Sequence, residues 1–218
     1  MASNKEHVTE KVVTGKVELT GFISLIKPST KFNKQGIYST YALLNAKEGK
    51  EFEQKMKDIR TEQFKKYGKG TKLAELQCKP YTIQDENTGE ETPDPQGRYI
   101  LTAKANAYIE NGKPKYKPQI FNAKKQPITG NISIGEGTIA RLGVTLSGYS
   151  VAGKTGVSVK LGLVQIIDLV EYSGGGFNLD ELDEEEGFDG VGTEFTEEVN
   201  EEVTEEAAEG EDEEEADF

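Results

Sequence analysis

Apolar and polar residues alternate along much of this chain with a period of two, which is typical of strands that have one face in a core. The pattern predicts a strand over residues 12–26 and another, rich in β-branched and aromatic residues, over 37–44. Two longer strands are predicted over residues 137–148 and 156–172, joined by a loop at 150–155. The chain is therefore expected to be mainly β.

A further strand is predicted over residues 98–109. Its apolar positions fall on one parity, whereas Lys104 and Tyr108 fall on the other. Asn111-Gly112, a dipeptide that favours a tight hairpin turn, follows, and residues 116–122 are expected to form the return strand. Because the apolar parity already supplies the core, Lys104 and Tyr108 are expected on the outer surface.

One segment departs from the strand pattern. In residues 48–67, apolar side chains recur at roughly helical spacing, and Gly68 and Gly70 follow, so an amphipathic helix is predicted. Residues 79–97 are rich in proline, glycine and acids and are predicted to form an exposed loop. Five or more strands with one inserted helix suit a five-stranded barrel of the oligonucleotide-binding type, the OB-fold.

Charge is distributed very unevenly along the chain. The net charge is −13, but residues 177–218 carry 21 acidic residues and no Lys or Arg. Residues 1–176 carry all 26 basic residues against 18 acidic ones, a balance of about +8. Such a polyacidic segment cannot offset its ordering entropy, so we expect a folded domain over 1–173 and a glycine linker with a disordered tail over 174–218. The basic part favours a polyanionic ligand, for which the tail is an arm or a competitor.

Residues 148–155 match the phosphate-binding loop of nucleotide hydrolases, and Asp168 ends an apolar run downstream. That loop requires a following helix, because the helix N-terminus points at the phosphates. Residues 156–172 alternate as a strand instead, and Asp168 comes within thirteen residues of Thr155. A hairpin turn with an exposed Lys154 is therefore favoured, and a nucleotide hydrolase using Lys154 and Asp168 is the alternative.

The residues of metal sites and nucleophilic catalysis are scarce. His7 and Cys78 are the only His and Cys, so no zinc set can be assembled and a Cys–His pair is not expected. A lone cysteine forms no internal disulfide, and no apolar run is long enough to cross a membrane. We therefore expect no metal and no cofactor.

Basic residues and aromatic rings interleave on the predicted polar strand faces and in their turns. Lysines neutralise phosphates and release counterions, and exposed rings stack on unpaired bases for about 1–3 kcal/mol per base. The pattern therefore indicates a surface for single-stranded nucleic acid. The candidate stacking rings are Tyr38, Tyr108, Tyr116 and Tyr149, and the candidate phosphate contacts are Lys34, Lys104, Lys117, Arg141 and Lys154.

An ordered set of segments resembles the single-stranded DNA-binding proteins of T7-type phages over most of the chain. Gly36-Ile37-Tyr38 and the predicted helix after it look like that family's second strand and inserted helix. Residues 148–171 are similar to its final hairpin. The triple glycine at 174–176 and an acidic tail ending in Asp217-Phe218 match its C-terminus.

The resemblance implies an OB-fold that binds single-stranded DNA without strong sequence preference, anneals complementary strands and has no enzymatic activity. It implies a homodimer that acts in DNA replication, recombination and repair in the cytoplasm of the infected bacterial host. The acidic tail, with Asp217 and Phe218 at its end, would contact the phage DNA polymerase and helicase–primase and would occupy the DNA groove when DNA is absent. By the same resemblance, Tyr149 is the ring of the last hairpin and Lys160 a phosphate contact of the final strand.

Two departures from the family bear on these expectations. Gln35 stands where the family has an Arg implicated in strand annealing, and the chain has no Trp, so stacking has to use Tyr or Phe. Another class of function stays open, that of a protein-interaction scaffold with an acidic arm. It would have no DNA affinity even without its tail, and it leaves the basic part without a role.

Overall fold

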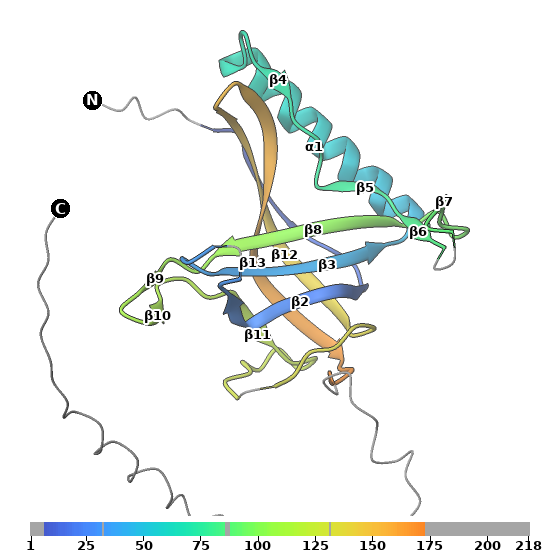
Figure 1. Ribbon diagram of the computed structural model, residues 1–218, viewed down its shortest axis with the longest axis vertical. Helices are drawn as coiled ribbons and strands as arrows, with labels where there is room; N and C mark the ends of the chain where they lie inside the picture. The colour runs from blue at the N-terminus through green and yellow to red at the C-terminus, as the bar shows by residue number, and fades with distance from the viewer. Residues whose placement is uncertain (1–6, 32, 86–87, 131, 173–218) are drawn as a thin grey trace, which may run out of the picture. The chain divides into compact units, whose positions relative to one another are not determined.

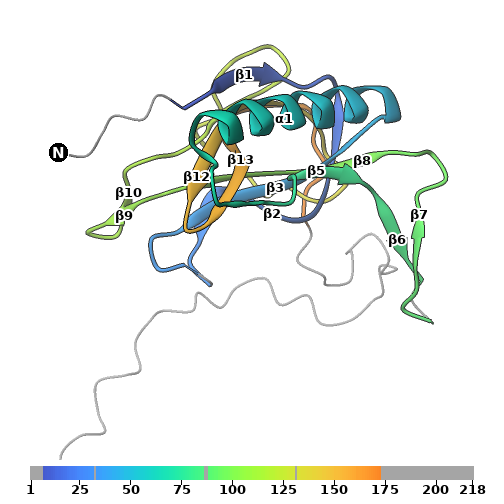
Figure 2. The same ribbon diagram turned by 90° about the horizontal axis from the view of Figure 1, so that it is seen from above.

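The computed structural model describes residues 7–31, 33–85, 88–130 and 132–172. Five of its strands pair in one ring, in the order β12, β2, β3, β8 and β13, and β13 pairs back with β12. Figures 1 and 2 show these strands wrapped around a common interior. The closed ring with one helix confirms the predicted OB-type barrel. The ring strands are β2 (Val17–Ser29), β3 (Ile37–Leu44), β8 (Tyr99–Asn106), β12 (Ile139–Val151) and β13 (Lys154–Asp168).

Eight shorter strands in the described part of the chain extend the ring or stand beside it. Four of them extend it: β1 (Thr9–Val13) pairs with β12, β4 (Lys72–Leu73) and β11 (Gln119–Phe121) pair with β13, and β5 (Cys78–Pro80) pairs with β8. The other four form two small hairpins, β6 (Thr82–Gln84) with β7 (Glu91–Pro93) and β9 (Ile109–Glu110) with β10 (Lys113–Pro114).

Several predicted elements were wrong in extent or pairing. The strand predicted over 98–109 ends as β8 at Asn106, so Tyr108 lies outside it, with φ of 52°. The stretch 12–26 belongs to two strands, because the chain turns at Gly15, whose N–H donates to Glu48 Oε1 at 2.6 Å. Before the turn β1 pairs with β12, and after it β2 pairs with β3. The predicted loop 79–97 contains strands β6 and β7. Within 116–122 only β11 is a strand, and it pairs in parallel with β13. The Asn111-Gly112 turn is confirmed between β9 and β10, with φ of 52° and 73°.

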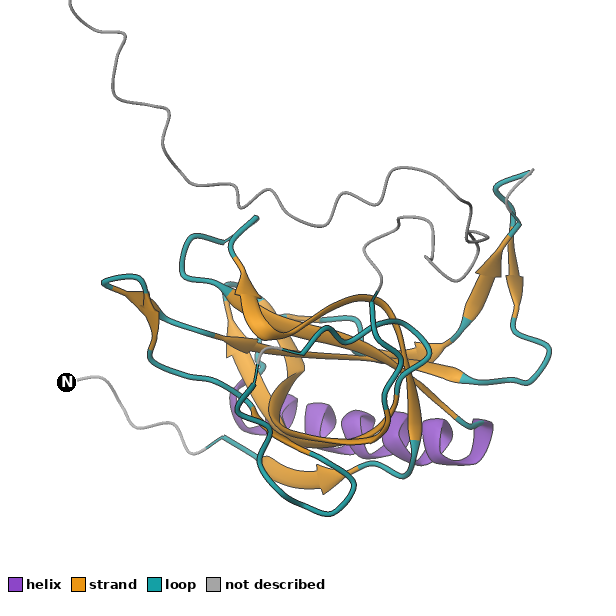
Figure 3. Ribbon diagram, turned by 90° about the horizontal axis from the view of Figure 1, so that it is seen from below, coloured by secondary structure: helices purple, strands orange, loops and turns teal. Residues whose placement is uncertain are grey.

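The predicted helix is confirmed as α1 (Ala46–Tyr67). It begins where Asn45 accepts a hydrogen bond from the Glu48 N–H at 3.0 Å, and it ends where the Gly68 N–H donates to Phe64 O at 2.8 Å. Its buried face contacts β12, β13 and β5, and Figure 3 shows the helix lying across one end of the strand ring. The residues of that face are Gly49, Phe52, Met56, Ile59 and Gln63.

A bulge in β13 changes which side chains reach the core. Val157, Val159 and Leu161 are buried on one parity, as the alternation predicts. The pairing with β12 then slips at Gly162, since Gly143 pairs with Leu163 but Val144 pairs with Leu161. Beyond the extra residue the core positions are Val164 and Ile166, so the alternation expected over 156–172, which would continue the buried parity to Leu163, is wrong from Gly162 onward.

Strands β12 and β13 meet in a tight turn instead of the predicted loop at 150–155. Val151 pairs with Lys154, and the two residues between them, Ala152 and Gly153, have φ of 51° and 73°. Such a two-residue turn with positive φ continues the strand twist. Residues 148–155, which match a phosphate-binding loop in sequence, therefore form a β-hairpin with a strand and no helix after it.

The predicted linker and acidic tail over residues 174–218, with Asp217 and Phe218, lie outside the described residues. The described residues fall within one compact unit of the chain. The predicted domain boundary after residue 173 stays a prediction.

The packing of α1 on β8 leaves no room for a side chain at Gly49. A Cβ at this position would lie 2.4 Å from the Cβ of Tyr99. We expect Gly49→Ala to lower the free energy of unfolding by about 1–3 kcal/mol, since overpacking outweighs the better helix propensity of Ala. Urea unfolding followed by circular dichroism measures the change. Gly130→Ala is the matched control, because a Cβ there meets nothing within 4 Å; equal stability of the two variants would contradict the packing argument.

Candidate nucleic-acid interface

The outer face of the barrel, meaning the ring-strand side chains that point away from the interior, carries two neighbouring lysines. Lys104 of β8 and Lys160 of β13 are Cα partners, and they form the one residue pair that joins these two parallel strands. Both side chains are exposed, because their neighbours along each strand supply the buried parity. We call Lys104 and Lys160 the central lysine pair.

Gln77 and Tyr116 hold the strands on both sides of the central lysine pair. The Thr102 N–H of β8 donates to Gln77 O at 2.8 Å, and the Val159 N–H of β13 donates to Gln77 Oε1 at 3.1 Å. On β13, the Tyr116 hydroxyl donates to Leu161 O at 2.7 Å. The backbone that presents Lys104 and Lys160 is therefore anchored by side-chain as well as strand hydrogen bonds.

The ring of Tyr116 supports a lysine. Lys160 Nζ lies 4.6 Å from the centroid of this ring, a cation–π contact. The ring is half-buried, and desolvation raises the pKa of the Tyr116 hydroxyl, so the phenol stays neutral and keeps its hydrogen bond. In this structure one face of the predicted stacking ring is occupied by Lys160.

Tyr149 and Lys154 lie on the β12–β13 hairpin, beyond the central lysine pair. Along the outer face, the cross-strand pairs run from Thr145–Lys160 through a pair of serines to Tyr149–Gly156. A Cβ on Gly156 would lie 2.5 Å from the Tyr149 hydroxyl oxygen, so the ring covers a position where only glycine fits. Tyr149 is partly exposed and Lys154, next to the turn, is exposed.

Arg141 is exposed at the opposite end of β12, where it pairs with Gln165. Arg141 and Tyr149 have the same parity on β12 and neither is buried, but they are eight positions apart. At about 3.4 Å per residue, this places them about 27 Å apart along the strand. Arg141 therefore lies away from the Tyr149 end of the outer face.

Lys34 and Tyr108 are brought together at the turn between β2 and β3. The N–H groups of Ala107 and Ile109, on either side of Tyr108, donate to Gly36 O and Gln35 O at 2.9 and 3.0 Å. Tyr108 has φ of 52° and is 49% exposed. Lys34 is exposed in the same turn, and Lys117 is exposed shortly before β11.

The prediction that Tyr38 offers an exposed ring is wrong. Tyr38 is fully buried in the core, and desolvation raises the pKa of its hydroxyl. Tyr41, three residues further along β3, has the opposite parity and is partly exposed beside Thr102. The alternation of Thr40, Ala42 and Leu44 could have identified Tyr41 as the outer ring.

Phe22 is a second exposed ring that the site prediction missed. It falls on the polar parity of β2, with Glu18 and Thr20, and is 62% exposed. An aromatic residue on an otherwise polar parity was a usable signal.

The candidate cations differ from three lysines of α1, Lys55, Lys57 and Lys66, which have acidic partners. Lys55 and Lys57 of α1 are paired with Glu10 and Glu53 at 2.6 and 2.9 Å. Among the described residues, no ion pair is formed by the six candidate phosphate contacts. Their charges are therefore available to an anionic ligand. The six are Lys34, Lys104, Lys117, Arg141, Lys154 and Lys160.

Other site types find little support in the part of the chain that the structure describes. Cys78 is buried, and burial raises the pKa of its thiol to about 12, so it stays protonated. No group of His, Cys, Asp and Glu side chains within the described ranges could hold a metal ion. No described helix is both long and apolar enough to cross a membrane.

Two solved structures have a similar fold. The crystal structure of gp2.5, a single-stranded DNA-binding protein encoded by bacteriophage T7, is similar with a TM-score of 0.58 at 15% identity, covering 83% of this chain and 98% of that one. The single-stranded DNA-binding protein from bacteriophage Enc34, in complex with ssDNA, is similar with a TM-score of 0.53 at 14% identity, covering 75% and 89%. No curated protein matches the sequence. Residues 10–201 match the family described as Enterobacter phage Enc34, ssDNA-binding protein, and the chain belongs to that family.

Proposed function

We propose that this protein binds single-stranded DNA across the outer face of β3, β8 and β13. The observation that carries the proposal is the central lysine pair, two exposed lysines held side by side on adjacent strands without an acidic partner among the described residues. Membership of a family of phage ssDNA-binding proteins supports it. Two like charges at this position gain a partner when a phosphate lies between them.

The proposed path runs between the two turns that flank the outer face. Lys34 and Tyr108 lie at the β2–β3 turn, and Tyr149 and Lys154 lie at the β12–β13 turn. Lysines would neutralise phosphates while Tyr41, Tyr108 and Tyr149 offer rings to unpaired bases. Every base has a π-face, so binding of this kind tolerates any sequence.

Two predicted contacts take modified roles in this proposal. Tyr116 orients Lys160 through the cation–π contact, and the buried Tyr38 supports the strand from inside. Lys117 and Arg141 extend the basic surface toward β11 and the far end of β12.

Substitution of the central lysine pair tests the proposal. We expect Lys104→Ala and Lys160→Ala each to weaken binding of a fluorescent single-stranded oligonucleotide and to reduce the slope of log K against log salt by about 0.7. In the double variant this slope should be reduced by about 1.4. Fluorescence anisotropy over a salt titration, with duplex of the same sequence as competitor, measures both quantities.

Lys57→Ala is the matched control, since Lys57 is a lysine of α1 paired with Glu53. The control should bind as the parent protein does. An unchanged salt slope in the Lys104/Lys160 double variant would exclude this face as the DNA site, and no DNA binding by the parent with or without its tail would favour the scaffold hypothesis.

We further propose that the protein coats single strands as a homodimer during phage DNA replication, recombination and repair in the host cytoplasm, without enzymatic activity. The domain over residues 1–173 would bind DNA, and the segment 174–218 would recruit the phage DNA polymerase and helicase–primase through Asp217 and Phe218. Strand annealing is proposed as well. Gln35 bears on it, because this exposed side chain lies beside Lys34 while its backbone oxygen is held by Ile109.

The charge contrast within the chain generates a prediction about the tail. Residues 177–218 carry 21 acidic residues and no basic ones, so they compete with DNA for the basic surface. Removal of these residues should tighten DNA binding most at low salt. The gain should shrink as the Debye length falls from about 30 Å at 0.01 M to about 8 Å at 0.15 M salt. Equal dissociation constants for the full chain and for residues 1–176 at low salt would rule out this competition.

A further inference from the structure

Strand β2 breaks away from β3 at a bend that exposes Phe22. Thr20 pairs with Tyr41, but the next pair is Ser24 with Ser39, so β2 holds two extra residues. Gly21 takes φ of 63° at this point, a conformation that favours glycine. The bend turns Phe22 outward, with 62% of its surface exposed.

Glu136 fixes the bend from the neighbouring loop. Its carboxylate accepts a hydrogen bond from the Thr20 hydroxyl. This bond and a second one from the Gly21 N–H lower the pKa of Glu136, so the group stays ionised at neutral pH and keeps both partners. The position of Phe22 is therefore held by specific contacts at the two preceding residues.

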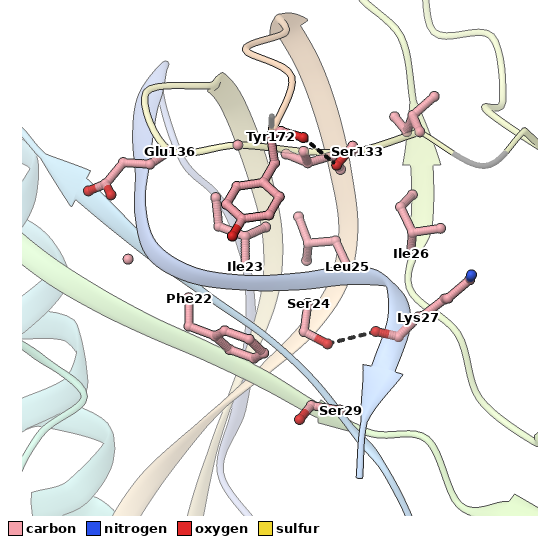
Figure 4. Close-up of a pocket in the computed structure, with 14 residues that line it drawn as sticks. Phe22, Ile23, Ser24, Leu25, Ile26, Lys27, Ser29, Ser133, Glu136 and Tyr172 are labelled. Carbon is pink, nitrogen blue, oxygen red and sulfur yellow. Dashed lines mark hydrogen bonds between the residues drawn. The ribbon is translucent and has the colours of Figure 1, made fainter. Parts of the chain in front are cut away.

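A pocket of about 650 Å³ opens between this part of β2 and residues 132–136, as Figure 4 shows. Tyr172 points into it and is 62% exposed. Its backbone is held in place, because the Ser133 hydroxyl donates to Tyr172 O at 3.1 Å and the Gly135 N–H donates to Val170 O at 2.7 Å. The pocket thus has two exposed aromatic walls on an anchored backbone.

The pocket has the chemistry of a nucleotide site. Its volume lies within the range of about 300–1,000 Å³ that small ligands occupy. Apolar side chains line it together with the polar Ser24, Ser29 and Ser133. Glu136 also lines it, but its carboxylate is held by Thr20 and Gly21, and Lys27 stands exposed at the same stretch of β2. Within the described ranges Lys27 forms no ion pair, so its charge can meet a phosphate.

The pocket also continues the outer face of the barrel. A Cβ on Gly21 would lie 3.5 Å from Tyr41 Cδ2, so the bend that carries Phe22 touches the outer ring of β3. A single-stranded DNA that crosses the outer face from β8 to β3 would reach this bend next. Two rings that remain largely exposed at the end of such a path are suited to an unpaired base.

We propose that the pocket is a separate base-binding subsite, in which one unpaired nucleobase lies against Phe22 and Tyr172 while Lys27 contacts its phosphate. This inference rests on the proposed function, because the strand must first lie on the outer face. The subsite adds a fixed contact at one position of the bound strand and sets where that strand leaves the barrel.

The test uses the full-length protein with oligothymidylates of about 4 to 16 nucleotides, the range of site sizes for OB-folds. In the parent protein, affinity should rise by a step at the length that reaches the pocket. The Phe22→Leu and Tyr172→Leu variants should bind oligonucleotides of at least this length about five- to 150-fold more weakly than the parent does, the equivalent of one lost stack. Oligonucleotides too short to reach the pocket should bind to the variants as they bind to the parent. Phe22→Tyr and Tyr172→Phe keep a ring and should keep the step.

A scan with a single abasic nucleotide locates the base. One abasic position should weaken binding to the parent protein and have no effect on the Phe22→Leu variant. Ile83→Ala, an exposed apolar residue of the β6–β7 hairpin, is the control and should change neither result. Circular dichroism confirms that each variant is folded.

The outcomes separate this inference from the proposed function. If no length binds, the proposed function fails. If, at each length, the oligonucleotide binds to the Leu variants with the same affinity as to the parent, the outer face binds DNA and the subsite is overturned. Loss of self-association in the Leu variants with unchanged DNA binding would also overturn it and assign the pocket to contacts between copies of the chain.

Discussion

The barrel closes where β8 meets β13, and this seam is narrow. Lys104 and Lys160 form the one residue pair between the two strands. Gln77 accepts a hydrogen bond from each strand, with its backbone oxygen from β8 and with its side-chain oxygen from β13. The long antiparallel pairing of β12 with β13 completes the ring. Because neither strand could present its lysine to the other without this closure, the proposed interface depends on it.

The same seam concentrates positive charge on adjacent strands. Like charges directly opposite each other on a sheet destabilise it by a few tenths to about 1 kcal/mol. Tyr116 reduces this cost, since a ring beneath an ammonium contributes about 0.5–1 kcal/mol at an exposed site. In the proposed interface a phosphate would relieve the remainder, which would favour the DNA-bound state over the free one.

A rigid scaffold surrounds this charged face. Helix α1 covers other parts of the ring through Gly49, Phe52 and Met56, and the β12–β13 hairpin carries Tyr149 on a tight two-residue turn. The rings that are proposed to meet bases are therefore placed by packed strands, which keeps the ordering cost of binding low. The bend at Gly21 is the exception, because there β2 leaves the sheet and a pocket opens beside it.

Much of this protein follows from its sequence alone. The spacing of apolar residues identifies α1, alternation places Lys104 outside and Leu101 inside, and the charge count separates a basic part from an acidic segment. These features depend on periods of a few residues or on composition, which a single chain displays directly.

Other features were decided by tertiary structure. Lys104 and Lys160 are 56 positions apart, and only the parallel closure of the barrel makes them neighbours. The bulge at Gly162 moves Leu163 off the core parity because β12 and β13 slip in register, which depends on the partner strand. Tyr38 is buried and Tyr41 is not because the core lies on one side of β3, and the pocket between Phe22 and Tyr172 exists only because distant segments are folded against each other.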